Sequence, residues 1–248
     1  MADERTSAGD PARTLHLLWR EPSAVPRRGP RQGLTVYSVV DAATALADAS
    51  GLEALTMRKV ASALGVVAMT LYTYVPGKAE LLDLMLDAAY GRMERVDTAG
   101  QPWRARITAV VLENRRLFEA HPWAASVSTA RPPLGPGQMG KYEHELSALD
   151  GIGLSDVEMD AALTHVLSFV QAWARSASSV AESTSTDEEW WAANAPLLER
   201  VLDPAAYPLA SRVGSAAGAE HGAAYSPGFA YEFGLARILD GLAALVER

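Results

Sequence analysis

Apolar residues recur at spacings of three and four along most of this 248-residue chain. Between residues 35 and 51, for example, Val36, Val39, Val40 and Ala43 fall on one helical face, and Gly51 ends the run. No stretch of any length alternates apolar and polar residues as a half-buried strand does. The pattern therefore predicts an all-α fold.

The same spacing places the other helices. We expect them over residues 57–64, 68–74, 78–89, 103–120, 138–149, 155–181, 188–202 and 229–246. Residues 203–227 are rich in Ala, Gly, Ser and Pro, and we expect a mobile loop there.

Two of these helices are short and are separated by only three residues, the first of which is Gly65. Thr56 is a suitable N-cap for the helix at 57–64, and Gly65 can adopt the left-handed conformation of a tight turn before the helix at 68–74. Ala61 is small at the point where the two helices must approach each other. With the preceding helix, this arrangement predicts a three-helix, helix-turn-helix domain over residues 34–78.

Charge is distributed unevenly along the chain. The net charge of −8 argues against a protein that binds nucleic acid over its whole surface. Residues 11–78, however, contain eight basic and four acidic residues, so the acidity belongs to the larger C-terminal part. We therefore expect a small basic DNA-binding domain followed by an acidic helical domain over residues 79–248.

Residues 1–33 are polar and contain many helix-breaking residues, and we expect a flexible basic N-terminal arm. Arg27, Arg28 and Arg31 lie among prolines and a glycine, which excludes a regular helix. These arginines either lie along DNA or belong to a solvated linker.

The segment from Leu34 to Leu86 resembles the TetR family of transcriptional regulators, through Leu55-Thr-Met-Arg, Leu64-Gly-Val, Leu71-Tyr-x-Tyr-Val and Lys78-x-x-Leu-Leu. A weaker resemblance to the ligand-binding and dimerisation domain of the tetracycline repressor extends through Ala130-Arg-Pro, Gly153-Leu-Ser, Trp190-Trp191 and the segment from Tyr231 to Leu242. The resemblance implies a dimeric regulator that binds double-stranded operator DNA and a small-molecule effector.

By position, the resemblance implies that Arg58 contacts a guanine or a phosphate, that Ala68, Met69, Thr70 and Thr73 face bases, and that Tyr72, Tyr74 and Lys78 contact phosphates. Since Ala68 and Met69 are apolar, we expect base reading to depend on Arg58, Thr70 and Thr73, with apolar contacts to thymine methyl groups. Arg58 could also be a solvated surface charge, and Tyr72 could pack on the first helix. A cation such as Lys78 opposes the dipole at a helix N-terminus, so stability gives no reason for it there.

The ligand pocket is expected among the helices at 103–120, 138–149 and 155–181. The resemblance places Val110, Asn114, Val127, Ala130 and Glu145 at positions that line the drug site. Phe118, Trp123, Tyr142, His165, Phe169 and Trp173 suggest an aromatic, largely apolar pocket, although ordinary core packing explains each of them as well. We expect His165 to be a hydrogen-bonded interior histidine.

Two departures from the tetracycline-binding members concern metal binding. The positions of the His and Glu that hold the drug–magnesium chelate are Val127 and Ser176 here, and neither can do so. The sequence therefore predicts that the chain is not a receptor for a tetracycline–magnesium complex, and it indicates no metal site or cofactor.

The dimer interface implied by the family is a four-helix bundle, which here would use the helices at 155–181 and 228–247. These helices carry more apolar surface than a helix with one solvent-exposed side needs. For the final helix the apolar residues are Phe229, Phe233, Leu235, Leu239, Leu242 and Val246. Some of them must also serve the core of the single chain.

Other functional classes have little support in the sequence. The chain has no cysteine, no metalloprotease His-Glu-x-x-His spacing, no phosphate loop and no nucleophile elbow, so we expect no enzyme activity. It has no apolar run long enough to cross a membrane and no secretory signal, and we expect a cytoplasmic protein. The prediction is a ligand-responsive repressor released from its operator by a small, largely apolar or aromatic effector. The alternative is a helical ligand-sensing or scaffold protein without specific DNA binding.

Overall fold

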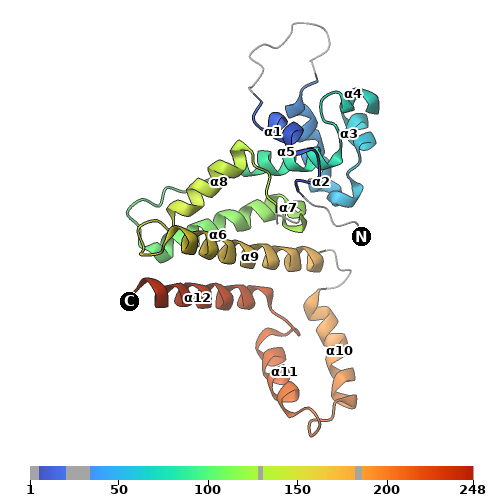
Figure 1. Cartoon of the computed structure of the whole chain (residues 1–248). Helices are drawn as coiled ribbons and strands as arrows, with labels where there is room; N and C mark the ends of the chain where they lie inside the picture. Colours follow the sequence, from blue (N-terminus) through green and yellow to red (C-terminus); the bar gives the residue numbers. More distant parts are fainter. Residues whose placement is uncertain (1–5, 21–33, 128–130, 182–185, 248) are drawn as a thin grey trace. The chain divides into compact units, whose positions relative to one another are not determined.

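The computed structural model describes residues 6–20, 34–127, 131–181 and 186–247, and all regular secondary structure within these ranges is helical (Figure 1). The all-α prediction is therefore confirmed. The helices are α1 (Pro11–Leu18), α2 (Val36–Ala54), α3 (Met57–Ala63), α4 (Ala68–Tyr72), α5 (Lys78–Gly91), α6 (Trp103–Ala120), α7 (Pro122–Ser126), α8 (Pro136–Ser147), α9 (Asp156–Ala181), α10 (Asp187–Val201), α11 (Pro208–His221) and α12 (Pro227–Val246).

Local capping residues explain where several helices begin. Thr35 and Ser38 form a capping box at the start of α2, and the Thr56 hydroxyl accepts a hydrogen bond from the Lys59 backbone N–H at the start of α3. Gly51 has a φ of 74° and interrupts α2 near its end, as its position in the sequence predicts.

The N-terminal segment is more ordered than the sequence suggests. Residues 6–20 are not a flexible arm, because α1 packs on α5 and buries Leu18. The Thr6 hydroxyl donates to the Arg131 carbonyl at 2.5 Å, and the Trp19 indole N–H donates to the Leu134 carbonyl at 2.7 Å. The arginines at 27, 28 and 31 lie outside the described residues.

Two further helices were not expected. The segment 203–227 contains α11 rather than a loop, because its alanines favour a helix, Pro208 suits the first turn and Gly222, with a φ of 64°, ends it. The short helix α7 begins at Pro122, where the sequence predicted only the end of α6. Proline is tolerated at that first helical position because its missing N–H needs no partner there.

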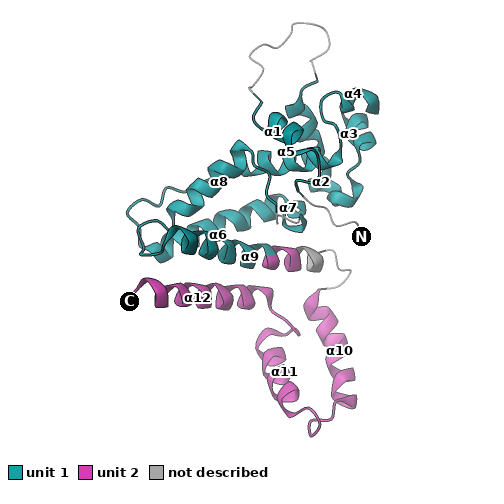
Figure 2. Cartoon of the chain, viewed as in Figure 1, with its two compact units in different colours: residues 1–171 teal, residues 172–248 magenta. Residues whose placement is uncertain are grey.

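The chain divides into two compact units, residues 1–171 and 172–248 (Figure 2). In the first unit, α5 is the central element, since it packs on α1, α2 and α8. Ten of its residues are buried, including Leu81, Met85 and Leu86. The predicted domain boundary at residues 78/79 falls at the start of this helix and stays a prediction. No helix among the described residues could cross a membrane.

Candidate nucleic-acid interface and ligand pocket

Helices α3 and α4 form a helix-turn-helix. Gly65 has a φ of 67°, and in the turn its backbone N–H donates to the Ser62 carbonyl. The next backbone N–H, of Val66, donates to the carbonyl of Ala61, whose side chain is buried. The turn therefore forms at the glycine that the sequence indicates, with a small side chain at the helix crossing.

The pair has a buried side and an exposed side. Val60, Leu71 and Val75 are completely buried and hold the two helices on the rest of the first unit. The residues predicted to face DNA are exposed or half-buried. Arg58, Met69, Tyr72 and Thr73 are exposed, and Ala68, Thr70, Tyr74 and Lys78 are half-buried. These side chains are thus available to a partner of this unit.

Arg58 and Tyr72 are the two residues of this set for which the sequence left a role without DNA open. Arg58 makes no hydrogen bond or ion pair with any described residue, so no contact within that part of the chain fixes its guanidinium. Tyr72 is 44% exposed, which leaves much of its ring free for contact with a partner.

Lys78 has a structural role that the sequence analysis missed. Its ammonium donates to the Leu52 carbonyl at 3.2 Å, in the last turn of α2. A cation is favoured at a helix C-terminus, so this contact stabilises the α2–α5 junction and corrects the expectation that stability gives no reason for a lysine at this position.

A cavity of about 320 Å³, including its open mouth, lies in the first unit. Its lining comes from α5, α6, α8 and α9 and consists of Tyr90, Asn114, Phe118, Lys141, Leu167 and Gln171. Asn114 and Phe118 are among the predicted ligand-binding residues. The other four were missed, because only the packing of α5 and α8 brings Tyr90 and Lys141 to the same place. The wall combines apolar surface with several polar groups.

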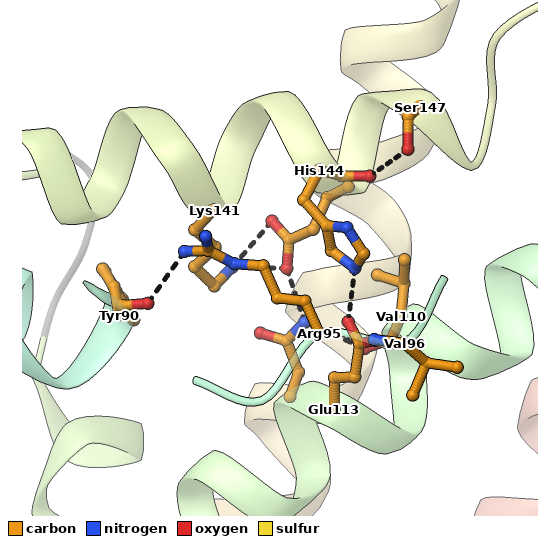
Figure 3. Close-up of polar contacts among 10 residues, drawn as sticks. Tyr90, Arg95, Val96, Val110, Glu113, Lys141, His144 and Ser147 are labelled. Atoms are coloured by element: carbon orange, nitrogen blue, oxygen red, sulfur yellow. Dashed lines mark hydrogen bonds and ion pairs between the residues drawn. The ribbon is translucent and has the colours of Figure 1, made fainter. Parts of the chain in front are cut away.

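Lys141, which lines this cavity, forms a buried ion pair with Glu145 (Figure 3). The Lys141 ammonium lies 2.7 Å from Glu145 Oε1, and the Glu145 side chain is only 1% exposed. Asn114 Nδ2 donates to the same carboxylate oxygen at 2.5 Å and to the Val110 carbonyl at 3.0 Å. Lys141 also lies over the Tyr90 ring, 5.1 Å from its centroid.

Glu113, which precedes Asn114 on α6, is a second buried carboxylate (Figure 3). Glu113 accepts a hydrogen bond from the Val96 backbone N–H at 2.6 Å, and its other oxygen lies 2.8 Å from His144 Nε2. Burial raises the pKa of the Tyr90 hydroxyl, and the carboxylates of Glu145 and Asp87 raise it further, so this hydroxyl stays protonated. It can therefore donate a hydrogen bond at neutral pH.

A second, smaller cavity of about 190 Å³, including its open mouth, lies nearby in the same unit. It is lined by Ile107, Val110, Glu145, Ala148, Leu149, Leu163 and Val166. Val110 and Glu145 are predicted ligand-binding residues, and Glu145 is the only residue with an ionisable side chain in this lining. The structure thus brings four predicted residues, Val110, Asn114, Phe118 and Glu145, to two neighbouring cavities.

The remaining predicted ligand-binding residues lie elsewhere. Trp123 is buried and donates to Asp48, Val127 is completely buried, and the Tyr142 hydroxyl donates to Asp160 at 2.7 Å. Phe169 is half-buried, Trp173 belongs to the second unit and packs against Tyr231, and Ala130 is not among the described residues. None of the described ones lines either cavity.

His165 is not an interior histidine. Its side chain is exposed, whereas Leu163, Val166 and Val170 are buried. At 100° per residue, position 165 falls on the helical face opposite these three. The helical face, rather than the residue type, decides the exposure of this side chain.

Helix α5 is joined to α8 through a buried carboxylate. Asp87 accepts a hydrogen bond from the Gln138 backbone N–H at 2.8 Å, at the start of α8. Burial raises the pKa of Asp87, and the backbone N–H groups of Gln138 and Gly137 oppose that rise. Because α8 contains Lys141 and Glu145, this contact connects the cavity wall with the helix that begins after the helix-turn-helix.

Asp83, one turn earlier on α5, is completely buried. Its Oδ1 accepts a hydrogen bond from the Ser7 backbone N–H at 2.8 Å, and its Oδ2 has no hydrogen-bond partner among the described residues. The pKa of Asp83 is raised from 3.8 to about 6, mainly because the carboxyl is buried. The hydrogen bond from the Ser7 N–H lowers this pKa, and the negative charge of Glu80 raises it.

This raised pKa predicts a pH-dependent stability. The folded chain holds a proton on Asp83 more tightly than the unfolded chain, so ionised Asp83 reduces stability above about pH 6, and this loss disappears as the pH falls toward 4. Asp83→Asn keeps an acceptor for Ser7, and we expect it to exceed the wild type by about 1–3 kcal/mol in free energy of unfolding at pH 8. Urea unfolding of both proteins at pH 8, 6 and 4 measures the difference in their free energies of unfolding. If this difference does not shrink as the pH falls, the pKa of Asp83 is not raised in the folded chain.

Comparisons with known proteins agree with this geometry. A model of bacterial regulatory proteins of the tetR family matches residues 39–85, and a model of the tetracyclin repressor-like C-terminal domain matches residues 97–246. The chain is 42% identical over 251 aligned residues to the HTH-type transcriptional repressor DrrR1 of Streptomyces coeruleorubidus. The alignment covers 99% of this chain and 90% of the relative.

Solved structures give the same result. ActR from Streptomyces coelicolor, in complex with actinorhodin, superimposes with a TM-score of 0.75 and 27% identity over 87% of this chain and all of that chain. The apo form of ActR gives a TM-score of 0.72 and 28% identity, over 86% of this chain and 97% of that one.

Proposed function

This chain belongs to the TetR family of bacterial regulatory proteins, and we propose that it is a ligand-responsive repressor that binds operator DNA through α3 and α4. The observation that supports this most is the exposed side of the helix-turn-helix. Arg58 and Lys59 of α3 are exposed, as are Met69 and Thr73 of α4, while Val60, Leu71 and Val75 of the same segment are completely buried. The combination suits a helix inserted into a major groove with cations beside the phosphates.

We place the effector in the cavity beside the Lys141–Glu145 pair. The structure of ActR with actinorhodin motivates this, since that relative holds a small molecule. Phe118 and Leu167 offer apolar surface, and Tyr90, Asn114 and Gln171 offer hydrogen-bonding groups. The proposed effector is therefore a small molecule with both apolar surface and hydrogen-bonding groups. It is not a tetracycline–magnesium complex, because Val127 and Ser176 cannot hold the chelate.

The response to effector depends on differential binding. An effector that displaces α8 also acts on α5, because Asp87 caps α8 and α5 begins directly after the helix-turn-helix. If the effector binds more tightly to a form whose recognition helices are wrongly spaced for the operator, it releases the DNA. We propose that this release occurs in the cytoplasm, where bacterial DNA lies.

We further propose that the active species is a homodimer, because two half-sites require two recognition helices. Helices α10 and α11 have no buried residue, and Phe229 and Phe233 of α12 are each 56% exposed. Isolated helices of this length are marginal in water, and a second copy would cover this apolar surface. A solution mass of one chain at micromolar concentration would contradict the dimer.

Arg58→Ala tests the proposed interface. We expect operator affinity to fall by about tenfold or more, since one cation contact to a base or phosphate is lost in each half-site. Arg116→Ala is the matched control, because Arg116 is exposed on α6, outside the helix-turn-helix. Fluorescence anisotropy with an operator fragment selected from genomic DNA measures both variants. Equal affinities for both variants and the wild type would contradict the interface, and a lack of any specific fragment would favour a scaffold without DNA binding.

A further inference from the structure

The N-terminal strap, residues 6–20, is fitted closely to the helix that follows the helix-turn-helix. Its helix α1 packs on α5 (Figure 1), and the Ser7 backbone N–H donates to Asp83 of α5 at 2.8 Å. At Gly9 the fit is so close that a Cβ atom would collide with the Glu80 carboxylate. The strap therefore follows the first two turns of α5.

The same strap is bonded to residues 131–134, the segment that leads into α8. The Thr6 hydroxyl donates to the Arg131 carbonyl at 2.5 Å, and the Trp19 indole N–H donates to the Leu134 carbonyl at 2.7 Å. These donors lie at the two ends of the strap, so the segment is held at both. Since α8 contributes to the cavity wall, the strap joins this wall to α5.

Ser7 bonds to both sides and has a strained backbone. Its φ is 54°, in the left-handed region that residues other than glycine rarely adopt. Its N–H donates to Asp83, and its hydroxyl donates to the Pro132 carbonyl at 3.4 Å. A residue keeps such a conformation only where its surroundings fix it. The tertiary bonds of the strap, rather than its local preferences, therefore determine its path.

A third contact joins the strap to the helix-turn-helix domain itself. The Arg20 guanidinium lies over the ring of Tyr37, 4.1 Å from the ring centroid, and Tyr37 belongs to the first turn of α2. The strap thus contacts α2, α5 and residues 131–134, all within the first unit.

We propose that the strap fixes the angle of the helix-turn-helix domain on the rest of its unit, and that Thr6 and Trp19 are positioning residues for operator binding. They act without touching DNA. A dimer must place two helix-turn-helix domains on two half-sites at once, so any freedom of either domain is lost on binding and lowers the affinity. A fixed angle also makes the affinity depend on the spacing of the half-sites. The role of the strap rests on the proposed dimeric, operator-binding function.

The double variant Thr6→Val, Trp19→Phe tests the proposal, because it removes both side-chain donors to residues 131–134 and keeps most of the apolar surface. Fluorescence anisotropy measures its affinity for a selected operator, for a single half-site, and for the operator with one base pair inserted between the half-sites. The insertion moves one half-site by about 3.4 Å and rotates it by about 34–36°.

We expect the double variant to bind the operator about three- to tenfold more weakly than the wild type, since its helix-turn-helix domains are less preorganised. It should bind the single half-site as the wild type does. The factor lost on insertion of the base pair should be about threefold smaller or less than in the wild type. Trp19→Phe alone, at a side chain that is 56% exposed, should shift all three affinities in the same direction by smaller factors.

His16→Ala is the matched control, because it trims an exposed side chain of α1 and should bind all three DNAs as the wild type does. If the double variant and the wild type lose the same factor on insertion, the strap does not set the angle and the inference is wrong. An equal loss of affinity for the single half-site would also overturn it, since the strap would then act on one helix-turn-helix domain alone. Failure of the wild type to bind any specific DNA would instead overturn the proposed function.

Discussion

Glu145→Ala is expected to lower the free energy of unfolding by about 3–5 kcal/mol, because it leaves the Lys141 ammonium buried without its carboxylate. Lys141 and Glu145 side chains are 7% and 1% exposed, and the two groups are 2.7 Å apart. The Tyr90 ring remains beside the ammonium but cannot replace a full negative charge. Asn114 also loses the acceptor that it shares with Lys141. Urea unfolding of the full chain measures the change.

Two controls separate lost charge pairing from lost packing. Glu143→Ala removes an exposed carboxylate from the same helix and should change stability by less than about 0.5 kcal/mol. The double variant Lys141→Met, Glu145→Leu removes both charges and keeps most of the volume, and it should be much more stable than Glu145→Ala. If Glu145→Ala and Glu143→Ala behaved alike, the pair would not be a buried ion pair in solution.

Gly137→Ala is the second change with a large expected effect, because a Cβ atom there would lie 1.9 Å from the backbone carbonyl oxygen of Asp87. The Gly91 backbone nitrogen would be only 2.9 Å away, so no side chain can rotate to make room. Helix α8 would have to move away from α5, which would also break the capping bond between Asp87 and Gln138. We expect a cost of about 3 kcal/mol or more in the free energy of unfolding.

Gly140→Ala is the control on the same helix. Its nearest neighbour would be the flexible end of the Arg95 side chain at 3.4 Å, and alanine favours a helix more than glycine does. We therefore expect unchanged or slightly higher stability for Gly140→Ala. Equal effects of the two alanines would show that α5 and α8 do not pack through Gly137.

The helix-turn-helix could be predicted from local chemistry alone. Thr56, Ala61 and Gly65 specify a cap, a close helix crossing and a tight turn within ten residues, and all three take those roles. The helix at Trp103–Ala120 was likewise predicted with correct ends, because its apolar spacing is long and regular. Local patterns are sufficient where the determining contacts lie within one or two turns.

The cavity could be predicted only in part, because its lining depends on packing between helices. Lys141 and Glu145 are four residues apart, which predicts a helical ion pair but not its burial. Tyr90 reaches the same wall from α5, which is distant in sequence. His165 shows the opposite error, since reading the residue type without its helical face placed an exposed side chain in the interior.

The N-terminal segment shows how tertiary contacts override composition. Its polar, glycine- and proline-containing sequence predicted an arm, whereas backbone and side-chain bonds from Thr6, Ser7 and Trp19 fix residues 6–20 on the first unit. The acceptors are backbone carbonyls at 131 and 134 and the Asp83 carboxylate, none of which local sequence can reveal.

The salt dependence of operator binding tests the central claim most directly. Wild-type protein is titrated into a labelled genomic fragment that it selects, at salt concentrations from about 50 to 200 mM. A dimeric helix-turn-helix protein with several phosphate contacts in each half-site should bind as two chains per site and lose about a thousandfold or more in affinity over this range. If no fragment is enriched, or if binding does not change with salt, the chain does not act through operator DNA.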